Sequence, residues 1–209
     1  MGYRERRRFR SASVVKVLIA LDHLRSGRDE GLLGPMLRSS DDAAASELWR
    51  RGGQGEIIER MVARAGLAET APPPAEWPGF WGYTAVSAAD VVRMYRYVLD
   101  EASERDRELV MGHLERATPC GSDGFDQTFG IPRALGRPWA VKQGWAGFGE
   151  EPDGRAAPGL GLGRPVLHTS GVVGDRIVVV LTLHPAGTSF RTASARLTTL
   201  TRQVHRAAG

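Results

Sequence analysis

The sequence has few residues of several types, and each scarcity limits what the protein can be. Its 209 residues include a single cysteine, Cys120, so no disulfide can form within the chain. No apolar run approaches the roughly 20 residues of a membrane-spanning helix, and the best candidate, residues 14–21, is interrupted by Lys16. The five histidines are far apart, without the close spacing of a zinc site. We therefore expect no transmembrane segment, no metal and no other cofactor.

Lysine and asparagine are unusually rare. Asparagine is absent, and only two of the 28 Lys and Arg residues are lysines, Lys16 and Lys142. A coding bias accounts for this pattern, so arginine supplies nearly all of the solvated positive charge. A lysine amine, unlike a guanidinium, can lose its proton when it is buried and can then act as a base. Lys16 and Lys142 are therefore candidate catalytic residues.

The positive charge of the chain is mostly scattered. The formal net charge is +4, and only residues 4–10 form a dense basic cluster. No aromatic stripe that could stack on bases follows this cluster. We expect no nucleic-acid partner, and DNA binding stays an alternative that rests on this cluster alone.

The first 25 residues predict a short extended segment followed by a buried helix. Residues 4–10 are expected to be extended, and Ser11 to Ser13 open a helix that runs to about Arg25. This helix is apolar on nearly every side, which is typical of a helix in the centre of a fold.

The remaining chain changes from helices to strands within one domain, residues 1–209. Residues from about 26 to 137 are mainly helical, with one helix expected from Ala88 to Asp100. Strands follow over 139–183, with a hairpin at Val173-Gly174-Asp175, and residues 188–207 form a closing amphipathic helix. The pattern predicts an α/β (α+β) domain in which flanking helices cover an antiparallel sheet and a helical subdomain is inserted before the strands.

Ser13 and Lys16 form the first candidate pair. Residues three apart share one face of a helix, so the Ser13 hydroxyl would lie beside the Lys16 amine. Ser13 at the helix start also carries one of the backbone N–H groups that lack a partner in the helix. A serine nucleophile needs a base within reach and donors for its oxyanion. The alternative is a helix-capping serine with an unrelated lysine, but a lysine inside an apolar helix needs a partner or loses its proton.

Two further segments carry chemistry-bearing residues. Ser40-Asp41-Asp42 precedes a helix, where a serine and two acids commonly serve as caps. Lys142-Gln143-Gly144 interrupts an apolar strand, and Gly144 would let another backbone or a substrate approach closely. An edge-strand lysine followed by a bulge glycine is the structural alternative.

The three segments together resemble the penicillin-binding proteins and class A β-lactamases. That family carries S-x-x-K, S-D-N and K-T-G in this order, and this chain has S-V-V-K, S-D-D and K-Q-G. The flanking segments F-R-S-A-S-V-V-K-V-L and M-L-R-S-S-D-D-A-A-A-S-E-L, and the order of strand, hairpin and closing helix, are similar too. The resemblance covers about residues 9 to 207 and implies a DD-peptidase/β-lactamase-like fold.

The resemblance implies a role for each motif residue. Ser13 would be acylated, Lys16 would be its base, and Ser40 would relay a proton to the leaving group. Asp42 would face the substrate and Lys16. Lys142 would support Ser40 and attract a substrate carboxylate. The substrate site would be completed by Gln143, Gly144 and Trp145. The backbone N–H groups of Ser13 and Trp145 would form the oxyanion hole. The implied substrate is a small molecule or peptide, such as a β-lactam or a cell-wall peptide.

Departures from the family pattern change the expected activity. Asp42 replaces an asparagine and should favour a protonated Lys16, and Gln143 replaces a threonine that contacts the substrate carboxylate. The loop from Ala71 to Tyr83 holds Glu76 but no E-x-x-N pattern, so fast β-lactam hydrolysis is not expected. A catalytically impaired relative that binds a cell-wall peptide or a protein partner is therefore the alternative.

The sequence begins close to Ser13, and no signal peptide is apparent. We expect a truncated N-terminus that lacks the family's first strands, and an exported or cell-envelope location by resemblance. The aromatic residues Trp77, Phe80, Trp81 and Tyr83 are interpreted as loop packing. The oligomeric state stays open.

Overall fold

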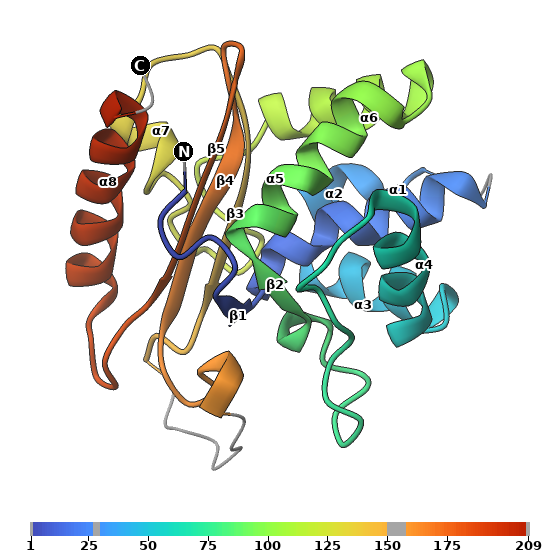
Figure 1. Ribbon diagram of the computed structural model, residues 1–209, viewed down its shortest axis with the longest axis horizontal. Helices are drawn as coiled ribbons and strands as arrows, with labels where there is room; N and C mark the ends of the chain where they lie inside the picture. Colours follow the sequence, from blue (N-terminus) through green and yellow to red (C-terminus); the bar gives the residue numbers. More distant parts are fainter. Residues whose placement is uncertain (1, 27–29, 150–157, 208–209) are drawn as a thin grey trace.

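A computed structural model describes residues 2–26, 30–149 and 158–207 (Figure 1). Its main elements are, in chain order, β1 (Arg8–Arg10), α1 (Lys16–Arg25), α2 (Leu33–Arg38), α3 (Asp42–Arg51), α4 (Gly55–Ala65), β2 (Ala85–Ser87), α5 (Ala88–Arg96), α6 (Glu104–Glu115), α7 (Ile131–Ala134), β3 (Trp139–Ala146), β4 (Val166–Val173), β5 (Arg176–Leu183) and α8 (Phe190–Ala207). Short 3-10 turns are η1 (Ala12–Val15), η2 (Trp81–Tyr83) and η4 (Pro158–Leu160), and η3 (Tyr97–Glu101) is a π-helical turn. Helices thus precede the long strands and their closing helix, as predicted.

The long strands form an antiparallel sheet in the order β3-β4-β5. In its register Lys142 lies opposite Ser170, and Gly144 lies opposite His168. A separate antiparallel pair, β1 and β2, joins the segment before Ser13 to residues 85–87. The predicted fold class, an antiparallel sheet with flanking helices, is confirmed.

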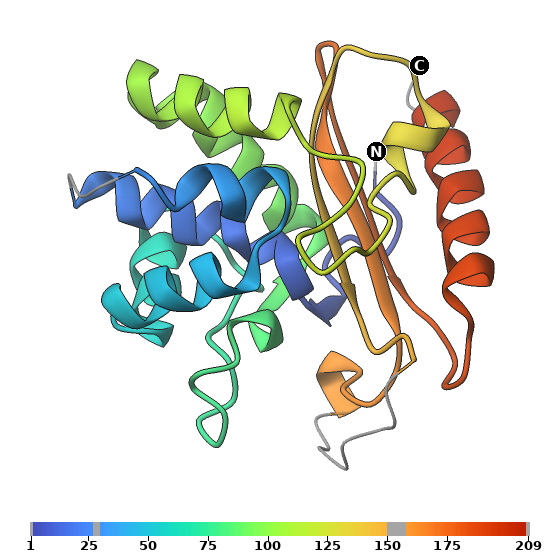
Figure 2. The ribbon, with the colours of Figure 1, turned by 180° about the vertical axis from the view of Figure 1, so that it is seen from behind.

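Helices cover both faces of this sheet (Figures 1 and 2). Helix α8 packs on β4 and β5 from one side, while α5 and α6 contact the strands from the other side. Side chains alternate between the two faces of a strand, so Lys142 and Gly144 of β3 face the helices α1 to α6, and Gln143 and Trp145 face away from them. The predicted boundaries of the helical subdomain, about 26 to 137, stay a prediction.

Helix α1 lies among the other helices and has no solvent-exposed apolar face. Val17, Ile19 and Ala20 are completely buried, and Leu18 is 1% exposed. The helix contacts α2, α3, α4 and α6. The prediction of a central helix that is buried on every side is confirmed.

The helix expected from Ala88 to Asp100 is not regular over its whole length. Helix α5 ends at Arg96, and η3 continues it with a wider turn in which the Ala102 N–H donates to the Tyr97 carbonyl at 2.8 Å. The wider turn leaves both Tyr97 and Val98 buried. A regular 3.6-residue period does not anticipate this turn, because the bond spans five residues rather than four.

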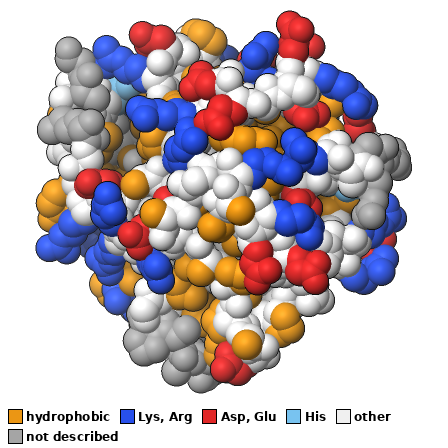
Figure 3. All heavy atoms as spheres, turned by 45° about the vertical axis from the view of Figure 1, so that its right-hand side comes forward, with side chains coloured by type: hydrophobic (Ala, Val, Ile, Leu, Met, Phe, Trp, Pro, Cys, Tyr) orange, Lys and Arg blue, Asp and Glu red, His pale blue; other side chains and the backbone are white. Residues whose placement is uncertain are grey.

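Arginine side chains on the surface are interleaved with acidic ones, as the face in Figure 3 shows. Arg60 pairs with Asp22 at 2.7 Å, and Arg93 pairs with Glu101 at 2.7 Å. Within the basic cluster of residues 4–10, Arg8 pairs with Glu69 at 3.2 Å. Part of the cluster's charge is therefore neutralised within the fold.

His168 is fully buried in β4 and ties the sheet to β1. The Thr182 N–H donates to His168 Nδ1 at 3.2 Å, so the Nε2–H donates to the Arg10 carbonyl at 2.9 Å. Burial lowers the pKa of His168 to about 4. The neutral ring therefore stabilises the strand that leads directly to Ser13.

We expect acid to destabilise the fold through His168. Its pKa is lower in the folded state than the ordinary value of 6.5, so its contribution is complete above pH 6.5 and is lost as the pH falls through about 4. The expected loss in the free energy of unfolding is about 3 kcal/mol. Urea unfolding at pH 7.5 and pH 4 should show this loss in the wild type and in His205→Gln, and a smaller one in His168→Gln. Equal losses in all three proteins would contradict the assignment.

Candidate functional site

Ser13 lies in η1, the 3-10 turn that leads into α1. The Ser11 N–H donates to the Thr84 carbonyl at 2.8 Å and anchors the chain before the turn. Ala12 then adopts a φ of +44°, in the left-handed region that residues with a Cβ rarely occupy. Backbone conformations of this kind persist where the surroundings enforce them, and they cluster at functional sites. The anchored turn fixes Ser13, which is 5% exposed, at the wall of a cavity.

Lys16, one turn after Ser13, is the centre of a buried polar cluster. Its Nζ donates to the Ser40 carbonyl at 2.6 Å, to Ser40 Oγ at 3.2 Å and to Asp42 Oδ1 at 2.5 Å. The same Nζ lies 4.6 Å from the centre of the Trp81 ring. Among the described residues, no hydrogen bond joins Lys16 to the Ser13 hydroxyl. The predicted partner for a buried Lys16 is therefore present, and it is Asp42.

Lys142 reaches the same cluster from β3. Its Nζ donates to Ser40 Oγ at 2.8 Å and to the Gln143 carbonyl at 3.4 Å. The Ser40 hydroxyl thus lies between the two amines. Asp41 caps α3 by accepting from the Ala44 N–H at 2.7 Å, which leaves Asp42 in the first turn of that helix, directed toward Lys16.

Burial dominates the electrostatics of both amines. It lowers the pKa of Lys16 below the ordinary lysine value, and the Asp42 carboxylate opposes part of that shift. Burial, together with the charge of Lys16, lowers the pKa of Lys142 well below the ordinary value. The aspartate at position 42, where the resembling family has asparagine, therefore makes the pKa of Lys16 less depressed but does not raise it above the ordinary lysine value. Both amines therefore lose a proton more readily than an ordinary lysine does.

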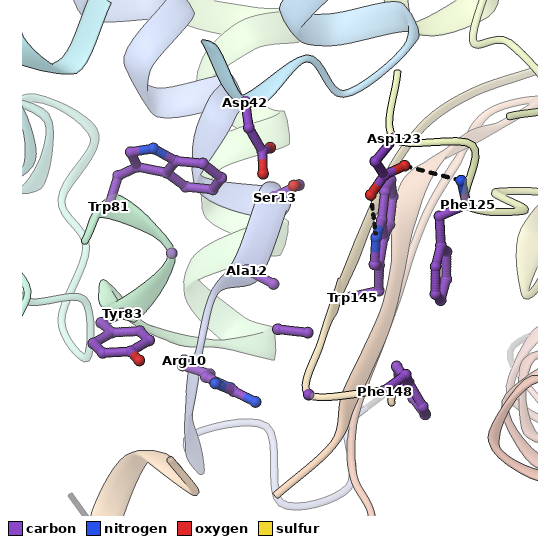
Figure 4. A pocket seen from close by; sticks show the side chains of 13 residues that line it. Arg10, Ala12, Ser13, Asp42, Trp81, Tyr83, Asp123, Phe125, Trp145 and Phe148 are labelled. Carbon is purple, nitrogen blue, oxygen red and sulfur yellow. Dashed lines mark hydrogen bonds between the residues drawn. The ribbon is translucent and has the colours of Figure 1, made fainter. Parts of the chain in front are cut away.

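A cavity of about 340 Å³ opens beside Ser13 (Figure 4). Trp81 and Tyr83 form one wall, and Phe125, Trp145 and Phe148 form the opposite wall. The rings of Phe125 and Trp145 are stacked with centres 4.9 Å apart. Charged side chains at the cavity are Asp42, Asp123 and Arg10.

The predicted site residues do not all reach this cavity. Ser13, Asp42 and Trp145 line it, whereas Lys16, Ser40 and Lys142 form the buried cluster behind it. Gln143 is 2% exposed, and its Nε2 donates to the Gln127 carbonyl at 3.1 Å and to the Phe129 carbonyl at 2.5 Å. These two carbonyls hold the Gln143 side chain away from the cavity, whereas Trp145, on the same face of β3, reaches it. The substrate contact implied for Gln143 has no support in this geometry.

Several lining residues were not singled out from the sequence. Trp81 and Tyr83 were interpreted as loop packing. Tyr83 does stack on Phe80, with ring centres 5.2 Å apart. Trp81 and Tyr83 nevertheless also line the cavity. Arg10, Asp123, Phe125 and Phe148 lie in segments without regular periodicity, and no spacing signal marks them. Glu76 of the same loop is exposed and is not among the lining residues.

Gly144 allows the turn that carries Ser13 to approach the sheet. A Cβ at this position would lie 3.0 Å from the Ser11 carbonyl oxygen and 3.1 Å from Val14 Cγ2. The prediction that another backbone approaches closely here is confirmed. The missing side chain thus sets the distance between β3 and η1.

We expect Gly144→Ala to lower the free energy of unfolding by about 2 kcal/mol, because the added methyl overpacks this contact. Gly136→Ala is the matched control, since a Cβ there would meet no atom within 4 Å. Its expected effect is within about 0.5 kcal/mol. Chemical denaturation of both variants measures the difference, and equal stabilities would contradict the close approach.

The described residues contain no group of three or more His, Cys, Asp and Glu side chains that could hold a metal ion. Within the same part of the chain, no helix is long and apolar enough to cross a membrane.

Known proteins resemble this chain in sequence and in structure. No protein-family model matches it. Proteins named "Putative lipoprotein LppW" from Mycobacterium bovis and Mycobacterium tuberculosis are 36% identical to it in an alignment 205 residues long that covers 90% of this chain. The chain spans about 60% of the length of these curated relatives.

Solved structures of class A β-lactamases superimpose on the whole chain. A reconstructed class A enzyme, the ancestor named GNCA, matches with a TM-score of 0.71 and 16% identity, over 99% of this chain and 88% of the other. A β-lactamase from Xanthomonas campestris matches with a TM-score of 0.72 and 15% identity, over 100% and 87%. Identities this low establish the fold alone. The chain is a divergent protein with the class A β-lactamase fold.

Proposed function

We propose that this chain is a serine acyl-transfer enzyme that forms an acyl-enzyme on Ser13. The observation that carries the proposal is the position of Ser13 between an open cavity and the buried cluster of Lys16, Ser40 and Lys142. Desolvated amines directly behind a fixed serine supply the base that nucleophilic catalysis requires. Burying several amines lowers the stability of the fold, so the presence of two buried lysines behind Ser13 supports a catalytic role for them.

The proposed reaction begins when Ser13 Oγ attacks the carbonyl carbon of an amide or ester. Neutral Lys16 takes the hydroxyl proton as the C–O bond forms, and the backbone N–H groups of Ser13 and Trp145 stabilise the oxyanion. The Ser40 hydroxyl, which accepts from both amines, passes a proton to the leaving nitrogen or oxygen as its bond to carbon breaks. Water then hydrolyses the Ser13 ester and releases the acid.

In this geometry Lys16 must first leave Asp42 and give up a proton before it can act as the base. The 2.5 Å contact between Lys16 Nζ and Asp42 Oδ1 occupies the base in the unliganded protein. Geometry at catalytic groups of unliganded enzymes is often loose and tightens when the substrate binds. Slow acylation, rather than none, is the expected behaviour.

We propose a cyclic or linear acyl donor of the β-lactam or cell-wall peptide kind as the substrate class. The fold of the class A β-lactamases supports this choice. The lipoprotein name of the mycobacterial relatives supports a cell-envelope location.

Labelling with activity probes tests the proposal. A fluorescent penicillin or a fluorophosphonate should label the wild type and Ser39→Ala, but not Ser13→Ala. Ser39 is a suitable control because it precedes Ser40 and its hydroxyl donates to the Pro35 carbonyl, at 2.9 Å, outside the cluster. No labelling of the wild type by either probe would reject the proposal.

A non-catalytic binding protein is the second candidate. The absence of a hydrogen bond from Lys16 to Ser13 within the described residues, and the pairing of Lys16 with Asp42, favour it. Such a protein would bind cell-wall peptides in calorimetry and would never increase in mass on incubation with an acyl donor.

A further inference from the structure

The charges around the cavity are distributed unevenly. Asp42 lies next to Ser13, Asp123 lies across the cavity beside Trp145, and Arg10 lies toward the opposite end (Figure 4). The Asp42 side chain is 71% exposed, so its outer oxygen is open to the cavity. Asp123 is close enough to this end for its charge to act on the pKa of Lys16. The end of the cavity that holds the nucleophile is therefore acidic.

Lys142, which by resemblance would attract a substrate carboxylate, does not line this cavity. Lys142 is 1% exposed and donates to Ser40 Oγ and to the Gln143 carbonyl. Gln143, at the position next to it, points to the other side of the sheet. The cation that lines the cavity is Arg10, toward its opposite end, so a carboxylate beside Ser13 would lie near Asp42 and Asp123 instead.

Asp123 is held in place by neutral donors. Its Oδ1 accepts from the Phe125 N–H at 2.9 Å, and its Oδ2 accepts from Trp145 Nε1 at 3.2 Å. Within the described residues no Lys, Arg or His forms an ion pair with it. The carboxylate is thus fixed and keeps its negative charge available at the aromatic wall.

The protein already binds one ammonium group with the same chemistry. Lys16 Nζ lies 2.5 Å from Asp42 Oδ1 and 4.6 Å from the centre of the Trp81 ring. A carboxylate together with the face of an aromatic ring is the combination that recognises ammonium ions. On the other side of the cavity, Asp123 places a carboxylate beside the Trp145 ring, and Phe125 stacks on that ring. Among the described residues, no cation pairs with Asp123.

We propose that Asp123, with Asp42, makes the site selective for acyl donors that carry a cationic ammonium group near the reacting carbonyl. This inference rests on the proposed acyl transfer at Ser13 and adds the charge of its substrate. Within the proposed class of β-lactams and cell-wall peptides, it favours donors that carry such a group.

Three p-nitrophenyl esters of equal chain length test the selectivity. Their acyl chains end in trimethylammonium, in its uncharged tert-butyl isostere, or in carboxylate. The rate of p-nitrophenol release in the first turnover should be highest for the cationic ester and lowest for the anionic one, with about a tenfold difference between the cationic and neutral esters. Asp123→Asn, which keeps the hydrogen-bonding shape, should reduce that preference about fivefold, and high salt should weaken it.

Asp175→Asn is the matched control, because it removes the same charge from a 95% exposed turn away from the cavity. It should keep the wild-type preference. Equal rates for the three esters, or an anionic preference, would overturn the inference while fluorophosphonate labelling of Ser13 still upheld acyl transfer. If neither the esters nor the fluorophosphonate modify Ser13, acyl transfer itself is wrong and the inference falls with it.

Discussion

Lys16→Met should lower the rate constant for acylation of Ser13 by about a hundredfold to ten-thousandfold, which is the usual contribution of a positioned general base. Methionine has a similar length and fills the same buried space, but it cannot accept a proton. The variant should nevertheless fold. Asp42 is 71% exposed and can be solvated once its partner is lost, and Ser40 Oγ keeps its bond to Lys142.

Stability separates a catalytic lysine from a structural one. Removing one partner of an ion pair is costly where the remaining charge stays buried, but the Asp42 side chain is 71% exposed. We therefore expect the free energy of unfolding of Lys16→Met to stay within about 1 kcal/mol of the wild type. Leu18→Met, two residues later in the same buried helix, is the control and should change neither quantity by much. Unchanged acylation in Lys16→Met would show that Lys16 is not the base.

Asp42→Asn should raise the acylation rate at neutral pH by about tenfold, because a larger fraction of the Lys16 amine is then neutral. Asp42 raises the pKa of Lys16 against the lowering effect of burial. Removing its charge therefore lowers that pKa further, and the pH at which acylation reaches half its maximum should move down. The substitution also frees Nζ from its 2.5 Å contact.

The neutral p-nitrophenyl ester suits this measurement, because the charge of the cavity does not alter its binding. Asp41→Asn is the control. It makes the same change in charge one residue earlier, and asparagine is an equally good helix cap. Asp41 raises the pKa of Lys16 less than Asp42 does, so the rate should rise much less than in Asp42→Asn. An unchanged pH profile in Asp42→Asn would mean that Asp42 does not restrain Lys16.

Much of the fold could be predicted from local patterns. The uninterrupted apolar surface of residues 17–21 predicted that α1 is central, and the period-two pattern around Gly174 predicted the β4–β5 hairpin. Lys16 was predicted to need a partner because an apolar helix cannot solvate an ammonium group. These features depend only on neighbours in the sequence.

The cavity could not be predicted in the same way. Its walls come from η2, from the irregular segment around Asp123 and from the end of β3, and only the tertiary structure brings these together. The direction of Gln143 depends on the face that Lys142 takes, and a strand pattern alone does not decide which face is which. Trp81 illustrates a further difficulty, since a ring that packs in a loop can also line a site.

Intact-mass and peptide-mapping mass spectrometry of the wild-type chain, after incubation with a fluorophosphonate and with a penicillin, tests the central claim most directly. Acyl transfer predicts one added probe per chain, on the peptide that contains Ser13, and no addition to Ser13→Ala. A modification of any residue other than Ser13, or no modification of a folded chain, would contradict it.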